Sequence, residues 1–309
     1  MKPFEQLPFS RLPERPRVPH PYFDTSARDV LVDSRYFGRV RLHVREHGAG
    51  PPLLLVHGLM TSSYSYRYVL EPLAKHFRCI VPDLPGAGRS DMPDVSYFSH
   101  ALAELIGELI DTLGIQGCRV IGNSLGGYLT LRLALARPDA MSRLVALHPP
   151  GVPLRRLSAL KTVFSVPGSR ALLDALIRRA PERWAHKNVH YWDESLKSLE
   201  EAREYGRPLS TPEGRRAFAH YLADALDPFD MVGFLHELSA KEFPIPLLYV
   251  YARRDPMVPP VVGERLAAAT RGGKLVWLDE GSHFAHVDAP EKFLAVALPF
   301  LQEQDPTSN

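Results

Sequence analysis

A serine, an aspartate and a histidine, the side chains of a nucleophilic triad, occur in that order along the chain at Ser124, Asp255 and His283. Ser124 is the centre of Gly122-Asn123-Ser124-Leu125-Gly126, which matches the G-x-S-x-G pattern of a nucleophile elbow. The elbow separates apolar residues 118–121 from residues 129–135, which predicts a strand, a sharp turn and a helix. Because a serine hydroxyl is a weak nucleophile, the pattern also requires a base, an orienting carboxylate and oxyanion donors.

The predicted base and carboxylate each follow an apolar strand. His283 lies in a loop after residues 275–278, and Asp255 is the first acidic residue after residues 247–251. Ligand sites of open parallel sheets form at the carboxyl ends of strands, so we expect these side chains to meet Ser124. Two alternatives are His286 as the base, although a packed histidine is the simpler interpretation, and Asp255 as a turn residue before proline.

Backbone amides are the predicted oxyanion donors. The Leu125 N–H lies at the start of the helix after Ser124, where the helix dipole favours negative charge. The second donor is expected in the loop His57-Gly58-Leu59-Met60, most plausibly as the Leu59 N–H. His57 itself is expected to brace this loop through hydrogen bonds.

Composition predicts an ordinary globular protein. Of 309 residues, 45% are hydrophobic and 23% charged, and 37 basic against 35 acidic residues give a net charge of +2, which provides no argument for nucleic acid or an anionic membrane as partner. No apolar stretch approaches the roughly 18 residues of a membrane span, and no signal peptide is recognised. Cys79 and Cys118 adjoin apolar runs and are predicted to be buried free thiols, which favours the cytoplasm.

No cofactor is expected, because no His/Cys spacing suits zinc and no phosphate-binding glycine loop occurs. No metal site is predicted either. The expected ligand is therefore a small organic substrate, and the oligomeric state, monomer or dimer, stays open.

Strand and helix patterns alternate from about residue 29, which predicts an α/β fold with a mostly parallel sheet covered on both faces. Residues 30–32 and 40–44 suggest a hairpin around Gly38, and a helical pattern before Gly114 starts near residue 98. The alternation stops over residues 151–241, which are rich in helix formers. We therefore predict a proline-rich arm over 1–28, a core over 29–150 and 242–309, and an inserted helical domain over 151–241.

Aromatic residues within this insertion suggest a substrate pocket. Trp184, Tyr191 and Trp192 lie close together in the chain, and with Met60 and Phe284 they are candidate pocket residues for an apolar acyl or aryl group. The alternative is that such aromatics attach the insertion to the core. A nearby set of basic residues is a candidate site for a substrate carboxylate, although a solvated helical face is the simpler interpretation: Arg178, Arg179 and Arg183.

Together these motifs resemble the α/β-hydrolase superfamily over about residues 29–303. The resemblance rests on His57-Gly58, on Asp83-Leu84-Pro85-Gly86, on the Ser124 elbow, and on Asp255 and His283. It implies an eight-stranded sheet with helices on both faces and a helical cap inserted after the sixth strand. It also implies that the segment at Asp83 is structural.

The nucleophile distinguishes among relatives within this superfamily. Haloalkane dehalogenases and epoxide hydrolases carry an aspartate where this chain has Ser124, so alkyl-enzyme chemistry is disfavoured. Asn123 before the serine is similar to the elbow of meta-cleavage-product C–C hydrolases. Those enzymes usually have a tryptophan after the histidine, where this chain has Phe284, and a glycine-rich loop where it has Leu59-Met60-Thr61-Ser62-Ser63.

We therefore predict a serine hydrolase that cleaves a carboxylic ester, or a related acyl bond, through an acyl-enzyme on Ser124. The first alternative is a C–C bond hydrolase. The second, of a different class, is a ligand-binding protein that keeps the fold without catalysis.

Overall fold

The computed structural model describes residues 3–303, so the first two residues of the predicted arm and the last six of the predicted core lie outside the described residues. Eight strands form one sheet in the order β1-β2-β4-β3-β5-β6-β7-β8. Strand β2 runs antiparallel to both neighbours, and the other adjacent pairs are parallel. The predicted mostly parallel sheet and the hairpin around Gly38 are confirmed. The strands are β1 (Ser26–Ser34), β2 (Gly38–His47), β3 (Pro52–Val56), β4 (Arg78–Pro82), β5 (Cys118–Asn123), β6 (Met141–Leu147), β7 (Leu247–Ala252) and β8 (Gly273–Leu278).

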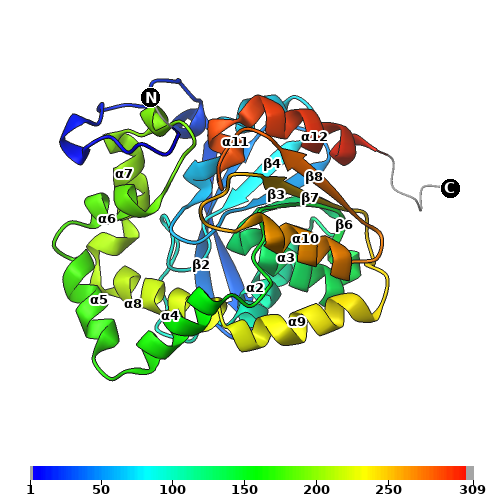
Figure 1. Cartoon of the computed structure of the whole chain (residues 1–309). Helices are drawn as coiled ribbons and strands as arrows, with labels where there is room; N and C mark the ends of the chain where they lie inside the picture. Colours follow the sequence, from blue (N-terminus) through cyan, green and yellow to red (C-terminus); the bar gives the residue numbers. More distant parts are fainter. Residues whose placement is uncertain (1–2, 304–309) are drawn as a thin grey trace.

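Helices cover both faces of the sheet because the central strands are apolar on both sides. Alternate residues of β3 enter different cores: Leu54 and Val56 pack on one face, Leu53 and Leu55 on the other. Figure 1 shows helices on the two sides of the central strands. The core helices are α1 (Leu70–Ala74), α2 (Ser99–Leu113), α3 (Leu125–Ala136), α9 (Pro228–Ala240), α10 (Pro260–Ala269), α11 (Ala285–Asp288) and α12 (Pro290–Gln302).

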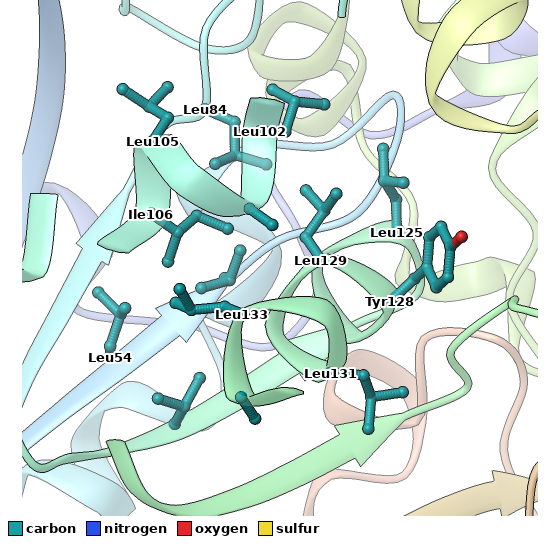
Figure 2. Packing of buried hydrophobic residues seen from close by; sticks show 14 of the residues in the cluster. Leu54, Leu84, Leu102, Leu105, Ile106, Leu125, Tyr128, Leu129, Leu131 and Leu133 are labelled. Carbon is teal, nitrogen blue, oxygen red and sulfur yellow. The ribbon is translucent and has the colours of Figure 1, made fainter. Parts of the chain in front are cut away.

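Helix α3, which follows Ser124, is anchored in the larger of the two cores. Leu129 and Leu133 lie between the sheet and α2, whose Leu102 and Ile106 are completely or almost completely buried (Figure 2). Burying a leucine contributes about 1.5–3 kcal/mol, so the helix has little freedom to move. Its first residue, directly after Ser124, is therefore held in a fixed place. Cys79 and Cys118 are buried and free, as predicted.

The cap is inserted after β6, as the resemblance implies, and consists of several short helices. In Figure 1 they form a group beside the end of the sheet. The helices are α4 (Arg155–Ser165), α5 (Ser169–Ile177), α6 (Pro181–Asn188), α7 (Leu199–Gly206), α8 (Pro212–His220) and a π-helical turn over Tyr221–Ala225.

Helix α9 belongs to the core, although the predicted insertion extended to residue 241. Its Phe234 packs edge-on against Tyr128 of α3, with ring centroids 4.9 Å apart. Its Asp230 forms an ion pair with Arg132 of the same helix α3. The chain therefore returns to the core near residue 228. The helical periodicity of α9 resembles that of the cap helices, so the sequence pattern does not mark this boundary.

The proline-rich arm packs on the cap. Its backbone carbonyl at Pro13 accepts from the Leu199 N–H at 2.8 Å, and Gln6 donates to the His186 carbonyl at 3.1 Å. Two 3-10 turns, Phe9–Arg11 and Tyr22–Asp24, lie within the arm. The arm thus connects the first core strand to α6 and α7 of the cap.

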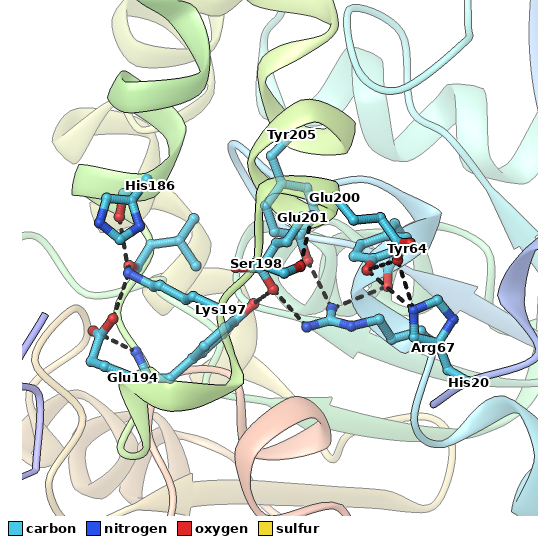
Figure 3. A network of polar contacts seen from close by, with 12 residues as sticks. His20, Tyr64, Arg67, His186, Glu194, Lys197, Ser198, Glu200, Glu201 and Tyr205 are labelled. Atoms are coloured by element: carbon cyan, nitrogen blue, oxygen red, sulfur yellow. Dashed lines mark hydrogen bonds and ion pairs between the residues drawn. The ribbon is translucent and has the colours of Figure 1, made fainter. Parts of the chain in front are cut away.

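A buried polar network joins the arm, the core and the cap (Figure 3). Arg67, which is fully buried, donates to Glu201 of α7 at 2.6 Å. Tyr64 donates to Glu200 at 2.7 Å, and His20 of the arm lies 3.0 Å from the same carboxylate. Residues from three parts of the chain are therefore fixed relative to one another. The Tyr64 side chain therefore helps to attach the cap to the core.

Candidate active site

Ser124, Asp255 and His283 come together at the carboxyl ends of β5, β7 and β8. Ser124 and His283 both line one cavity, and the His283 Nδ1 lies 2.7 Å from an Asp255 carboxylate oxygen. Strands β5, β6, β7 and β8 are parallel neighbours in the sheet, so their carboxyl ends lie at the same edge. This arrangement brings Ser124 into one site with Asp255 and His283, which follow it by more than 100 positions in the chain, as the topology of open sheets predicts.

Ser124 occupies a strained backbone conformation at the elbow. Its φ of 53° and ψ of −122° lie where few non-glycine residues occur. The turn also requires glycine nearby, because a Cβ on Gly126 would lie 2.2 Å from the Val56 carbonyl oxygen. The sharp turn lifts the hydroxyl above the end of the strand, where it faces the cavity.

Asp255 is buried and fully committed to the loop and to His283. One carboxylate oxygen accepts from the backbone N–H groups of Met257 at 2.6 Å and Val258 at 2.9 Å. The other accepts from the His283 Nδ1–H. Burial alone would raise the pKa of Asp255, but attraction to His283 and the hydrogen bonds outweigh it, and the net pKa is lowered. The carboxylate is therefore ionised and holds the imidazole with its Nε2 free to accept a proton.

The predicted oxyanion loop lies beside the elbow. Leu59, Met60 and Leu125 all line the cavity, and Leu125 is the first residue of α3, so its N–H has no intrahelical acceptor. A Cβ on Gly58 would lie 2.8 Å from the Ser124 Cβ, which shows how closely the loop approaches the nucleophile. Met60 has a φ of 63°, so backbone strain also occurs on this side of the site.

His57 braces this loop in the way the sequence suggests. Its Nε2 accepts from the Leu84 N–H at 2.9 Å, so its Nδ1 carries the proton and donates to the Gly58 carbonyl at 2.8 Å. The neighbouring Asp83 is buried and accepts from the backbone N–H groups of Ser63 and Arg89. These residues shape the loop and do not face the cavity as reactants.

Asn123 connects the nucleophile strand to the base loop. Its side-chain amide donates to the His283 carbonyl at 3.1 Å, and the residue is fully buried. The asparagine thereby fixes the distance between the elbow and the histidine. Its position before the serine suggested a comparison with C–C hydrolases, whereas its contact here is with the base loop.

His148 is a site neighbour whose importance the sequence alone does not indicate. It follows β6 with a φ of 49°, its Nε2 accepts from the Ala252 N–H at 2.6 Å, and it lies 4.0 Å from the Asp255 carboxylate. Burial lowers the pKa of His148 to about 3, so the ring is neutral. It fixes the end of β7, from which Asp255 extends. The positive φ is visible only in the fold.

His148, Asp255 and His283 also place one potential metal ligand each within 4.8 Å of one another. Two of these groups already have hydrogen-bond roles: the His148 Nε2 accepts from Ala252, and the His283 Nδ1 donates to Asp255. The cluster is therefore accounted for by the hydrogen bonds of a triad and its support. His286, the alternative base, is buried against Tyr66 and Phe293.

The cavity above Ser124 is mainly apolar and measures about 380 Å³. Met60, Trp184 and Phe284 of the predicted pocket residues line it. Its walls come from the core and from the cap, where α4, α6, α8 and the π-helical turn after α8 contribute to the lining. The lining residues are Leu59, Met60, Ser124, Leu125, Pro150, Val152, Leu154, Arg156, Leu157, Leu160, Trp184, Asn188, Val189, Phe218, Leu222, Leu226, Met257, Val258, Val262, His283 and Phe284.

Tyr191 and Trp192 are not among these lining residues, which corrects their predicted place in the pocket. Tyr191 is buried and donates to Glu201 at 2.7 Å, while its ring packs edge-on against Phe284. Trp192 packs against Phe4 of the arm and under the Arg254 guanidinium. Both aromatics attach the cap to neighbouring parts of the protein. Tyr191 packs against Phe284 of the core, and Trp192 packs against the arm and the Arg254 side chain.

Comparisons with known proteins agree with this architecture. Residues 51–290 match the family model described as alpha/beta hydrolase fold. Haloalkane dehalogenase 2 of Mycobacterium tuberculosis is 29% identical over 271 residues, covering 86% of this chain and 94% of that protein. A 2-hydroxymuconate semialdehyde hydrolase of Pseudomonas sp. is 26% identical over 275 residues, covering 86% and 92%.

Among solved structures, a thermophilic esterase from Thermogutta terrifontis superposes with a TM-score of 0.72 at 23% identity, covering 89% of this chain and 98% of the esterase. Within residues 3–303, no helix has the length and apolar character needed to cross a membrane. The family model spans most of the chain, residues 51–290 of 309. The chain belongs to the α/β-hydrolase fold family.

Proposed function

We propose that this protein is a serine hydrolase that cleaves carboxylic esters through an acyl-enzyme on Ser124. The observation that carries the proposal is the buried hydrogen bond between Asp255 and His283, 2.7 Å long, at a cavity that Ser124 and His283 share. A protein that only binds a ligand has no need of a strained serine beside an oriented imidazole.

In the first half of the reaction, the His283 Nε2 accepts the Ser124 proton as the hydroxyl oxygen attacks the ester carbonyl. The amides of Leu59 and Leu125 stabilise the tetrahedral oxyanion, a contribution for which each donor is typically worth about 10² to 10³ in rate. His283 then gives the proton to the leaving alcohol, and an acyl-enzyme remains. Asp255 stabilises the imidazolium that forms between these steps.

In the second half, His283 removes a proton from water, which attacks the acyl-enzyme carbonyl. The tetrahedral intermediate collapses, Ser124 regains its proton from His283, and a carboxylic acid leaves. The overall reaction consumes one ester and one water and yields one acid and one alcohol. It requires no redox step.

The cavity supports an apolar acyl or aryl group as the part of the substrate near the serine. Leucine, valine, methionine and aromatic side chains dominate its lining, to which none of the acidic side chains within residues 3–303 contributes. Apolar pockets with a few polar groups are typical of small-molecule sites. Trp184 of the cap and Phe284 of the core each contribute an aromatic ring to the lining.

The serine at the elbow leads us to expect a different reaction from that of the dehalogenase relative. Displacement of a halide needs a carboxylate that forms an alkyl-enzyme ester, and the elbow here carries a serine. A serine forms an acyl-enzyme from a carbonyl substrate instead. The proposal therefore follows the residue present in this chain and not the name of that relative.

The test is hydrolysis of p-nitrophenyl esters of increasing acyl length, together with labelling by a fluorophosphonate probe. Ser124→Ala is expected to lower kcat by about 10⁴ or more and to abolish labelling, because no other hydroxyl or thiol side chain among residues 3–303 lines the cavity. The exposed Ser210→Ala is the matched control and is expected to keep both properties. Equal ester turnover by Ser124→Ala and the wild type would contradict the proposal.

Hydrolysis of a C–C bond is the second candidate, and the similarity to the 2-hydroxymuconate semialdehyde hydrolase favours including it. A vinylogous 1,5-diketone of that substrate class, followed by loss of its absorbance, separates the two activities. Turnover of the diketone well above that of every ester would replace ester cleavage as the principal activity. Probe labelling of Ser124 without turnover of either class would instead indicate an untested acyl substrate.

A further inference from the structure

One cationic side chain stands at the rim of the otherwise apolar cavity. Of the described residues that line it, Arg156 and Met257 alone are exposed, so they mark the opening to solvent. The remaining polar lining residues are Ser124, His283 and Asn188, and the Asn188 amide donates to the Trp184 carbonyl at 2.8 Å. Arg156 is therefore the strongest fixed positive charge of this surface.

Arg156 has no competing partner in the part of the chain that the structure describes. No carboxylate, carbonyl or aromatic ring among residues 3–303 forms a hydrogen bond, an ion pair or a cation–π contact with it. By contrast, Lys161 of the same helix pairs with Asp227, and Arg183 stacks on Phe9. The Arg156 guanidinium, with five donors and a permanent charge, stays available to a ligand.

Helix geometry keeps Arg156 on the cavity side of α4. Leu160 lies one turn further along the same face, and Leu157 lies next to it; both line the cavity. Arg155 is exposed and does not contribute to the lining. Arg155 and Arg156 are both exposed, but only Arg156 of the two lines the cavity.

We propose that the natural substrate is an ester whose apolar acyl chain ends in a carboxylate, and that Arg156 binds this carboxylate at the rim while Ser124 attacks the carbonyl at the inner end. This inference rests on the proposed ester hydrolysis and specifies its substrate class, a monoester of a dicarboxylic acid. The apolar walls accommodate the methylene chain between the two ends. The three arginines suggested from the sequence for a carboxylate, Arg178, Arg179 and Arg183, do not line the cavity.

The test compares p-nitrophenyl monoesters of dicarboxylic acids with p-nitrophenyl alkanoates of equal chain length. For the wild type, kcat/KM is expected to be higher for the acid-ended ester at one chain length, and added salt is expected to reduce that preference. Arg156→Gln is expected to lower kcat/KM for the acid-ended ester about 5- to 20-fold, mainly through KM, since a charge-assisted pair at a partly exposed rim is lost. The same variant should change kcat/KM for the alkanoate by less than about twofold.

Arg155→Gln is the matched control and should leave both substrates and the salt response unchanged. Equal losses on both substrates in Arg156→Gln, or an undiminished preference for the acid-ended ester, would overturn the assignment. A wild type that prefers the neutral ester at every chain length would overturn it as well, even if Ser124-dependent ester hydrolysis is established.

A binding measurement separates failure of this inference from failure of the proposed reaction. In the Ser124→Ala background, monomethyl hexanedioate is expected to bind more tightly than methyl hexanoate, and Arg156→Gln should remove the difference. If no ester is hydrolysed but this difference is found, the rim site stands and the reaction fails. If esters are hydrolysed and the difference in binding is absent, the proposed reaction stands and the rim site fails.

Discussion

At the scale of single residues, burial sets the charge of the groups around the triad. His148 and His286 are fully buried, and burial lowers the pKa of both, so both rings are neutral. Asp255 keeps its charge because His283 and two backbone amides stabilise the carboxylate. The Asp255 carboxylate is thus the charged group that orients the His283 ring.

Asp288 is the exception, because burial raises its pKa to about 6 despite hydrogen bonds from the Ser282 and Trp192 amides. The folded state therefore binds a proton that the unfolded chain releases near pH 4, and the stability linked to this proton is lost as pH rises through 6. The asparagine variant lacks this titrating group. The stability of Asp288→Asn minus that of the wild type is therefore expected to increase by an amount on the order of 1 kcal/mol from pH 5 to pH 8.

The measurement is the urea midpoint of unfolding at both pH values. The control is Asp279→Asn, at an exposed aspartate that pairs with Arg253; the stability change in this variant should be small. A constant difference for Asp288→Asn across this range would contradict the raised pKa. Asp288→Asn also replaces one carboxylate oxygen, a hydrogen-bond acceptor, by an amide group. The stability lost in this way is the same at both pH values and does not alter the change between them.

At the scale of elements, the close approach of α3 to β3 requires a residue without a side chain. A Cβ on Gly126 would lie 2.2 Å from the Val56 carbonyl oxygen and 2.5 Å from that of His57. Both atoms belong to backbone that the sheet holds in place, so neither can move without disturbing the oxyanion loop. The glycine after the elbow is therefore a packing requirement of the site.

Gly126→Ala is expected to destabilise the protein by about 3 kcal/mol and to lower esterase activity, because overpacking shifts α3 or the loop at Leu59. Gly233 in α9 has open space around its Cβ position and is the matched control. Gly233→Ala is expected to stabilise by about 0.5–1 kcal/mol, since alanine favours the helix. Thermal unfolding of both variants provides the comparison, and a neutral Gly126→Ala would contradict the packing argument.

At the scale of the whole molecule, the network around Arg67 determines how the arm, the cap and the core fit together. Arg67 follows the oxyanion loop in the chain, and Glu201 belongs to cap helix α7. Tyr191 donates to the same Glu201 carboxylate, and its ring packs on Phe284 beside His283. The cap is thus anchored by buried charge close to the site.

Arg67→Met is expected to destabilise the protein by about 3–5 kcal/mol, because it leaves the Glu201 carboxylate buried without its cation. The double variant Arg67→Met, Glu201→Gln should recover part of this loss, since the uncompensated charge is removed. The exposed pair Arg28 and Glu46 is the control, and Arg28→Met should cost no more than about 1 kcal/mol. Denaturant unfolding measures these three variants and the single variant Glu201→Gln, which additivity requires. Additive losses in the double variant would contradict the coupling of these two residues.

The sequence could predict most of the fold because its signals are local. Apolar runs ending at Gly58, Pro82 and the elbow indicate buried strands, and Gly114, with a φ of 63°, ends α2 as expected. The start of α9 could not be recognised, since a core helix and a cap helix have the same periodicity. What assigns α9 to the core is its contact with α3 and α10, which depends on residues distant in sequence.

For the candidate site, the sequence by itself determined the residue types and their order: Ser124, Asp255 and His283, each after a strand. Only the tertiary structure decided which other residues face the serine. It places Arg156 at the cavity rim, turns Tyr191 towards Glu201, and brings His148 to the end of β7. The physical reason is that a strand end is a local signal, whereas a cavity wall is the joint product of side chains from separate elements, each placed by its own packing.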